Sequence, residues 1–249
     1  MNYNPFSIEG KQILITGASS GIGRTTSIEC SKMGAKVIIT GRNQERLQET
    51  YDQLTGTDHV QIIADLCTEA GINQILDSLP VIDGIVNNAG IGKIAPFQFI
   101  KSTDLMEIFN TNFFSAVSVT QQLVKKKKLG KNGSIVFVSS IDGPVTTHVG
   151  NSMYAASKGA LTAMAKNMAV DLAGKNIRVN CVLPGTTETP LIHGIGLTQE
   201  QLSEDMKLFP MRRYGKPEEI AYAIIYFLSE ASSWTTGSNL VVDGGFTLI

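Results

Sequence analysis

The sequence predicts an α/β fold in which one parallel sheet of seven strands is covered by helices on both faces. Seven short runs of β-branched and other apolar residues recur along the chain, and segments with helical patterning separate them. Most of these runs are continuously apolar, as is typical of strands buried on both faces of a parallel sheet. No Pro- or Ser-rich linker divides the 249 residues, so we expect a single domain over residues 1–249.

The expected elements alternate from the amino terminus onward. The strand runs lie at residues 12–16, 36–40, 60–64, 82–86, 134–139, 178–183 and 239–242. The helical segments include residues 23–33, 44–54, 103–128, 152–173 and 217–229, several of which open on Ser, Thr or Pro. Repetition of the strand-helix unit with right-handed crossovers gives a doubly wound, Rossmann-type arrangement.

Composition and charge disfavour several classes of protein. The net charge of -1 gives no overall attraction to nucleic acid or to an anionic membrane, so we expect neither as a partner. The start of the chain lacks a leader pattern and no apolar run is long enough to span a membrane, which predicts a cytoplasmic location. Cys30, Cys67 and Cys181 lie far apart without metal-ligand spacing, so we expect no disulfide and no metal, and we interpret all three as buried apolar side chains.

A glycine-rich turn follows the first strand run. The stretch Thr16-Gly17-Ala18-Ser19-Ser20-Gly21-Ile22-Gly23 leads directly into a helix. Glycines let the backbone approach a pyrophosphate closely, and the free N–H groups and the dipole at the helix start attract the anion. The spacing is Gly-x3-Gly-x-Gly, and taken alone it is equally consistent with an ordinary turn.

Tyr154 and Lys158 form a candidate acid/base pair. They are four residues apart in an expected helix, so they share one helix face. A nearby ammonium favours the phenolate and lowers the pKa of a phenol below its usual value of about 10, which makes Tyr154 a plausible proton donor. The pattern by itself is weak, because amphipathic surface helices often contain it. Ser139 and Ser140, at the end of the fifth strand run, supply hydroxyl groups upstream.

Together and in this order, the motifs resemble the short-chain dehydrogenase/reductase family over about residues 10–246. Besides the glycine turn, the resemblance includes Asp65-Leu66 after the third strand run and Asn87-Asn88-Ala89-Gly90 after the fourth. It continues with Pro184-Gly185-Thr186-Thr187-Glu188-Thr189 and Val242-Asp243-Gly244-Gly245. The family's Asp contacts adenine; a helix cap is the structural alternative for Asp65.

The resemblance implies a nicotinamide cofactor and no metal. The cofactor-binding residues that it implies are Gly17, Ser19, Ser20, Gly21, Ile22, Gly23, Arg42, Asp65, Leu66, Asn88, Ala89, Gly90, Tyr154, Lys158, Pro184, Gly185, Thr187 and Thr189.

Arg42 predicts NADP (NADPH) as the cofactor. In NAD-selective sites an acidic residue at the end of the second strand binds the ribose 2′-hydroxyl, and this chain has Thr40-Gly41-Arg42 there. A guanidinium offers a charge-assisted fork to the 2′-phosphate instead. Arg24, just after the glycine turn, is a candidate for a second phosphate contact.

The resemblance also implies the catalytic residues Asn112, Ser140, Tyr154 and Lys158. Ser140 would bind the substrate oxygen and Tyr154 would donate the proton. Lys158 would lower the Tyr154 pKa and hold the nicotinamide ribose, while Asn112 would connect Lys158 to solvent. Asn110 is the rival for the Asn112 role. The three histidines, His59, His148 and His193, lie in no chemical motif, and we place none of them in the site.

Overall length and residues 211–221 are most similar to those of bacterial 3-oxoacyl-acyl-carrier-protein reductases. This implies a β-ketoacyl substrate, a role in fatty acid biosynthesis, a homotetramer, and docking of acyl carrier protein through Lys131 and Lys175 beside the cleft. Residues 189–213 contain many apolar side chains, which predicts a lid over an apolar portion of the substrate.

Two other functions remain open on the sequence alone. A polyol, sugar or hydroxysteroid dehydrogenase would use the same machinery. A catalytically inactive, NADP-binding regulatory protein would keep the fold without turnover, although the intact Ser140, Tyr154 and Lys158 argue against it.

Overall fold

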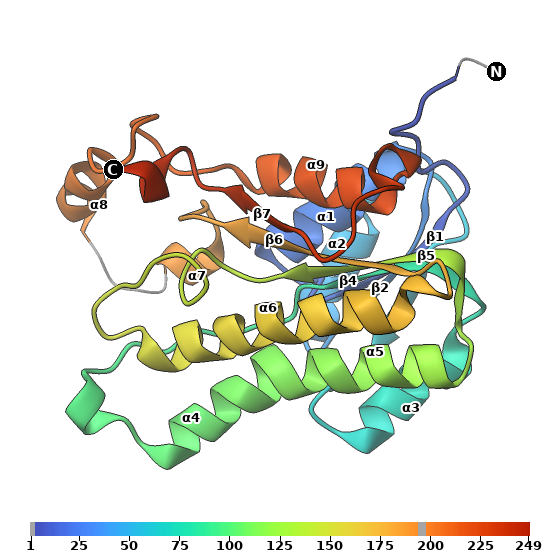
Figure 1. Cartoon of the computed structure of the whole chain (residues 1–249), viewed down its shortest axis with the longest axis horizontal. Helices are drawn as coiled ribbons and strands as arrows, with labels where there is room; N and C mark the ends of the chain where they lie inside the picture. Colours follow the sequence, from blue (N-terminus) through green and yellow to red (C-terminus); the bar gives the residue numbers. More distant parts are fainter. Residues whose placement is uncertain (1–2, 194–197) are drawn as a thin grey trace.

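The computed structural model describes residues 3–193 and 198–249, which form one parallel seven-stranded sheet between two helical layers (Figure 1). The strand order is β3-β2-β1-β4-β5-β6-β7, and all neighbours are parallel. The strands are β1 (Gln12–Thr16), β2 (Lys36–Gly41), β3 (Val60–Ile63), β4 (Ile82–Asn87), β5 (Leu129–Val138), β6 (Arg178–Pro184) and β7 (Asn239–Val242). The predicted fold class is confirmed.

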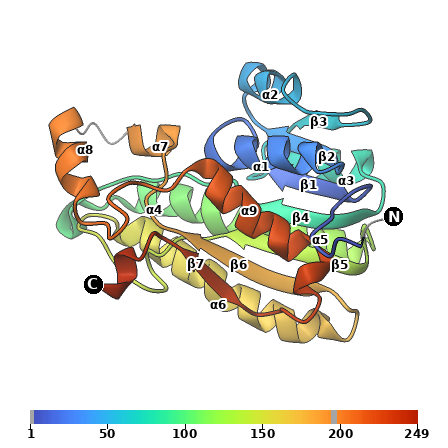
Figure 2. The ribbon, with the colours of Figure 1, turned by 90° about the horizontal axis from the view of Figure 1, so that it is seen from above.

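The helices cover both faces of the sheet, as Figures 1 and 2 show. They are α1 (Gly21–Lys32), α2 (Gln44–Tyr51), α3 (Glu69–Ser78), α4 (Ser102–Phe109), α5 (Ser115–Lys125), α6 (Ser152–Ala173), α7 (Pro190–His193), α8 (Gln199–Met206) and α9 (Pro217–Leu228). One core lies between the sheet and α1, α2 and α9. The other lies between the sheet and α3, α5 and α6. Because both faces are buried, the central strands carry continuous apolar runs.

The segment predicted as one helix over residues 103–128 contains a π-helical turn. This turn, η2 (Asn110–Phe114), joins α4 to α5. A π turn inserts one extra residue and changes which side chains face the core. Here it leaves Asn112 buried, a consequence that helical periodicity does not predict.

β5 and Cys67 differ from their predicted states. β5 begins at Leu129, earlier than the apolar run at residues 134–139, and its register with β4 shifts between Ile82 and Gly84. The early residues include the positive-φ Asn132 (φ 66°), which hides the strand pattern. Cys30 and Cys181 are buried as predicted, but Cys67 is exposed, because it lies in the turn between β3 and α3.

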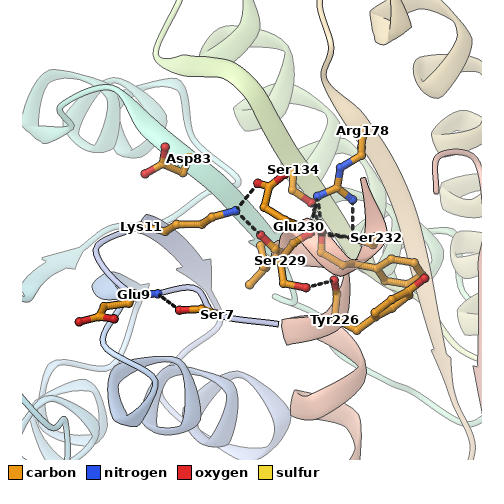
Figure 3. A network of polar contacts seen from close by, with 12 residues as sticks. Ser7, Glu9, Lys11, Asp83, Ser134, Arg178, Tyr226, Ser229, Glu230 and Ser232 are labelled. Carbon is orange, nitrogen blue, oxygen red and sulfur yellow. Dashed lines mark hydrogen bonds and ion pairs between the residues drawn. The ribbon is translucent and has the colours of Figure 1, made fainter. Parts of the chain in front are cut away.

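The carboxyl end of α9 is anchored by cations from two other parts of the chain (Figure 3). Arg178, at the start of β6, donates hydrogen bonds to the carbonyl oxygens of Phe227 (2.8 Å) and Ser229 (3.3 Å). Lys11 donates to the carbonyl oxygen of Leu228 (2.9 Å). The last carbonyls of a helix lack partners within it and attract positive charge. These contacts therefore fix α9 against the sheet at the amino-terminal edge of β6.

No helix among residues 3–193 and 198–249 is long and apolar enough to cross a membrane. The cytoplasmic location stays a prediction.

Candidate active site

A cleft of about 980 Å³ lies at the carboxyl ends of the strands. Its walls come from the segments that follow β1, β2, β3, β4, β5 and β6. The sheet reverses its order of strand addition between β1 and β4, and ligands of open α/β sheets bind at such a switch point. This cleft, where the glycine turn and the Tyr154 helix meet, is therefore the candidate binding site.

The cleft brings together nearly all of the predicted site residues. Every predicted cofactor residue except Gly23 lines it, and so does Ser140. Gly23 and Asn112 lie behind the wall and support it.

The turn after β1 fits a diphosphate group. A Cβ atom at Gly17 (φ 65°) would lie 2.7 Å from the Ala89 Cα, so only glycine allows this close approach. Gly23 packs beneath the turn, where a Cβ would lie 2.4 Å from the Asn88 Nδ2. The side chain of the N-cap residue Ser20 does not cap α1, and the first turn of the helix holds no acidic residue. The backbone N–H groups there are available to an anion.

Asn88 ties the end of β4 to this turn. Its Nδ2 donates to the carbonyl oxygens of Thr16 (3.0 Å) and Gly17 (3.2 Å). The Thr16 hydroxyl accepts from the backbone N–H groups of Asn88 (3.0 Å) and Ala89 (3.1 Å). These bonds hold two neighbouring strand ends in register and fix the shape of the turn.

At the end of β2, the cleft is lined by two exposed arginines, Arg42 and Arg46. Sequence reasoning missed Arg46; its place in the first turn of α2 was the available signal. Arg24 does not line the cleft, and its role as a phosphate contact stays a prediction. Its guanidinium is held by the Ser19 carbonyl oxygen (2.8 Å) and by Glu49 (2.8 Å), so it braces α1 against α2.

Asp65 lines the cleft after β3 and accepts a hydrogen bond from the Cys67 N–H (2.9 Å). The alternative that it caps the next helix is wrong, since Thr68 is the N-cap of α3 and accepts from the Gly71 N–H.

Tyr154 and Lys158 face each other from the first turns of α6. The Lys158 Nζ lies 5.6 Å from the centroid of the Tyr154 ring and donates to the Val138 carbonyl oxygen at 2.8 Å. The Ser139 hydroxyl donates to the Lys158 carbonyl oxygen (3.1 Å). Ser140 completes the group and accepts from the Asp142 N–H (3.0 Å). The end of β5 therefore holds α6 at the position where Tyr154 reaches the cleft.

The expectation that Lys158 lowers the Tyr154 pKa is not met in this structure. Burial raises the pKa of Tyr154 to about 12, although the neighbouring Ser140 hydroxyl opposes this shift. Burial likewise lowers the pKa of Lys158 to about 8. Both directions have one physical cause, because a buried group is disfavoured in its charged form. The Lys158 ammonium donates to the Val138 carbonyl oxygen, and within the described residues no cation donates a hydrogen bond to the Tyr154 hydroxyl.

Asn112 lies behind Lys158 and is fully bonded. Its Nδ2 donates to the Ile91 carbonyl oxygen (2.9 Å) and to the Ser157 hydroxyl (3.1 Å), and its Oδ1 accepts from the Ile91 N–H (2.8 Å). A Cβ at Gly90 would lie 3.4 Å from the Asn112 Oδ1 and 3.5 Å from the Lys158 Nζ. The rival, Asn110, is exposed and does not line this cleft. The relay role of Asn112 stays a prediction.

His148, which sequence reasoning left out, lines the cleft. Its Nδ1 lies 2.6 Å from the Asp142 Oδ1, and the hydrogen bond to Asp142 raises the His148 pKa above its ordinary value. The other Asp142 oxygen accepts from the Asn151 side-chain amide. No motif marks this cluster. The available signal was its position between Ser140 and Tyr154.

The predicted lid over residues 189–213 lies only partly within the described residues. Residues 194–197 are outside them, as are the side chains of Leu191 and His193. In the described part, Ile192 lines the cleft, but so do Asp205 and Tyr214, whose hydroxyl donates to the Asp205 Oδ2 (2.7 Å). Phe209 is buried against Phe246 instead. The expectation of an apolar substrate surface is therefore met only in part, and a lid stays a prediction.

The placement of Lys131 and Lys175 beside the cleft is wrong for a single chain. Lys131 lies near the amino end of β5, and Lys175 follows the carboxyl end of α6. The 22 residues of α6 extend over about 33 Å, and Tyr154 is at its other end. Neither lysine lines the cleft.

The chain is similar over nearly its whole length to known oxidoreductases. A family model described as enoyl-(acyl carrier protein) reductase matches residues 17–247. The chain is 36% identical to the 3-oxoacyl-[acyl-carrier-protein] reductase FabG of Thermotoga maritima, over 97% of this chain and 99% of that protein. The structure of a short-chain type dehydrogenase/reductase from Mycobacterium marinum matches with a TM-score of 0.90 and 31% identity over 98% of both chains. A gluconate 5-dehydrogenase from Burkholderia cenocepacia, in complex with NADP and tartrate, matches with a TM-score of 0.89 and 28% identity over 98% of both chains.

The buried charge of Lys158 predicts a pH-dependent cost in stability. With a pKa lowered from 10.5 to about 8 in the folded protein, the unfolded chain binds the proton more tightly between these values. Folded stability therefore rises with pH from about 8 to 10.5. We expect the free energy of unfolding of the parent to gain about 2 kcal/mol relative to Lys158→Met between pH 7 and pH 9.5.

Urea denaturation of both proteins across this range measures the difference, and groups common to the two proteins cancel. If the free energies of unfolding of the two proteins changed in parallel with pH, burial of the Lys158 charge would not lower the stability of the fold.

Proposed function

We propose that this chain, which belongs to the short-chain dehydrogenase/reductase family, reduces a carbonyl group to an alcohol with NADPH as the hydride donor. The observation that carries the proposal is the grouping of Ser140, Tyr154 and Lys158 at one end of the cleft, with the glycine turn and Arg42 also in its wall. A cofactor fold alone does not imply catalysis, whereas a phenol beside a hydroxyl and an ammonium in one cleft supports it.

Four residues of the chain have separate roles in the proposed reaction. When bound, NADPH supplies the hydride that reaches the carbonyl carbon. The Ser140 hydroxyl donates a hydrogen bond to the carbonyl oxygen and orients it. The Tyr154 hydroxyl gives that oxygen its proton, and the Lys158 ammonium stabilises the resulting phenolate. Asn112 holds the Ile91 backbone next to Lys158, where protons from solvent restore the pair.

Arg42 supports NADP over NAD in this proposal. It lines the cleft at the end of β2 together with Arg46, and two guanidinium groups provide the bidentate donors that a 2′-phosphate accepts. The similar gluconate 5-dehydrogenase is described in complex with NADP.

For the substrate, we favour a 3-oxoacyl (β-ketoacyl) thioester, because the FabG protein of Thermotoga maritima matches over nearly its full length. Such a substrate would place the protein in fatty acid biosynthesis, with acyl carrier protein as a partner. Within one chain, Lys131 and Lys175 are too far from the cleft to dock the carrier. A polyol or sugar-acid dehydrogenase is the second candidate, favoured by the polar group of Asp142, His148 and Asn151 in the cleft and by the similarity to gluconate 5-dehydrogenase.

Exposed apolar side chains support assembly as a homotetramer. They are Met106 on α4, Phe114 in the π turn, Val170 on α6, and Leu248 and Ile249 at the carboxyl terminus. Apolar surface of this kind is typical of protein interfaces.

Replacing Tyr154 by Phe tests the catalytic proposal. The substitution removes only the hydroxyl, so folding and NADPH binding should persist, while kcat/KM for every ketone falls by at least about 1000-fold. Steady-state kinetics and fluorescence titration of NADPH measure the two effects. Substantial turnover by Tyr154→Phe would assign the proton donor elsewhere. NADPH binding by the parent without turnover on thioester, sugar and steroid ketones would favour the inactive, regulatory alternative.

Replacing Arg42 by Ala tests the choice of cofactor. Loss of the guanidinium should weaken NADPH binding by about tenfold or more and change NADH binding little, since only NADPH carries the 2′-phosphate. Binding constants for both cofactors give the answer, with Arg24→Ala as the comparison because Arg24 is held by Ser19 and Glu49. An unchanged NADPH preference in Arg42→Ala would refute the assignment.

A further inference from the structure

The substrate end of the cleft holds a histidine-carboxylate pair that the proposed reduction does not use. Asp142 and His148 line the cleft together with Ser140 and Tyr154. The Asp142 side chain is only 7% exposed, whereas that of His148 is 46% exposed. A carboxylate buried this far requires hydrogen-bonding partners. His148 therefore binds Asp142 on one side of its ring, and the other side is accessible.

The position of the His148 ring is fixed by two direct contacts, and a third contact holds its partner Asp142. Asp142 binds its Nδ1 at 2.6 Å, and Phe246 stacks on the ring with centroids 5.6 Å apart. The second Asp142 oxygen is held by Asn151, the residue directly before α6. The pair is thus attached to the helix that carries Tyr154. A carboxylate at Nδ1 keeps the proton there, and within residues 3–193 and 198–249 the Nε2 atom forms no hydrogen bond.

The surrounding charges define what Nε2 can bind. The ionisable groups that affect His148 are Asp142 and, from α8, Asp205. The charge of Asp142 also raises the pKa of Tyr154. The cleft also contains Lys93, but its ammonium is paired with Asp104 (2.8 Å) and Glu107 (2.6 Å). The two carboxylates of Asp142 and Asp205 outnumber the single positive charge of a protonated His148, so the site disfavours an anionic ligand. A neutral oxygen acceptor matches a protonated Nε2–H donor.

We propose that His148, positioned by Asp142, binds a second, neutral carbonyl oxygen of the substrate and so selects ketones that carry an ester or thioester carbonyl over isolated ketones. This inference rests on the proposed reductase function and assigns a specificity-determining residue to it. His148 takes no part in proton transfer to the reacting oxygen, which remains with Tyr154.

Three matched probes isolate the second carbonyl. Ethyl acetoacetate carries it, 4-ethoxybutan-2-one replaces it with a methylene group, and acetoacetate presents an anionic carboxylate. Because an ester also activates the neighbouring ketone, the measured quantity is the change in the kcat/KM ratio of the first two probes between parent and variant.

His148→Phe keeps a ring to stack on Phe246 but has no N–H group. It should reduce the ester-to-ether ratio by about tenfold or more, the effect of one charge-assisted hydrogen bond. His148→Gln restores an amide donor and should recover part of the ratio. Thr147→Ala, at the exposed neighbouring position outside the cleft lining, should leave it unchanged.

The parent should also lose its preference for the ester as pH rises. Asp142 raises the pKa of His148 above 6.5, so the Nε2–H donor is present below that raised value and lost above it. The ratio should fall across this transition in the parent and stay flat in His148→Phe.

The outcomes separate the two proposals. NADPH binding without reduction of any probe by the parent would overturn the reductase function and this inference with it. Reduction by the parent with the same ratio in His148→Phe would overturn the role of His148 alone. A fall in kcat/KM of His148→Phe that is confined to acetoacetate would identify a carboxylate as the group that His148 binds, and would likewise overturn the proposal.

Discussion

The ammonium group of Lys158 is buried at the end of β5, where it donates to the carbonyl oxygen of Val138. Burying a charge is costly unless it is bonded, and the arrangement around this group follows from that constraint. Ser139 fixes the backbone of α6 at the same level. The π turn brings Asn112 to the wall behind Lys158. These contacts keep the Lys158 ammonium one helical turn from Tyr154, as the proposed acid/base role of Tyr154 requires.

The glycine turn after β1 and the Asp142–His148 pair occupy different parts of the same cleft, and different kinds of contact hold them in place. Asn88 and Thr16 hold the turn through backbone contacts between β1 and β4, a geometry that suits an anion of fixed shape. Asp142 and His148 are side chains on the segment between β5 and α6. Residues on such a segment can change without disturbing the sheet.

Much of the fold could be predicted from the sequence because burial on both sheet faces leaves a strong pattern. The runs at residues 12–16 and 239–242 have the same limits as β1 and β7. The start of β5 and the π turn were not predictable, since Asn132 and Asn112 are polar residues whose roles depend on tertiary contacts. Motifs identified most of the predicted residues that line the cleft. The directions in which the pKa values of Tyr154 and Lys158 shift could not be predicted, because sequence spacing shows that two residues are close but not how deeply they are buried. The Asp142–His148 pair was missed for a similar reason, as a contact within an irregular loop has no sequence period.

In the proposed reaction, Lys158 and a bound cofactor together make Tyr154 acidic enough to act near neutral pH. Ultraviolet difference titration of the parent against Tyr154→Phe measures the Tyr154 phenolate directly. Without cofactor, burial keeps the pKa near 12, so no Tyr154 phenolate should form up to about pH 10. With saturating NADP⁺, whose nicotinamide ring adds a second cation, phenolate should form below pH 9 in the parent but not in a Lys158→Met background. An equal titration of Tyr154 with and without Lys158 would contradict the account.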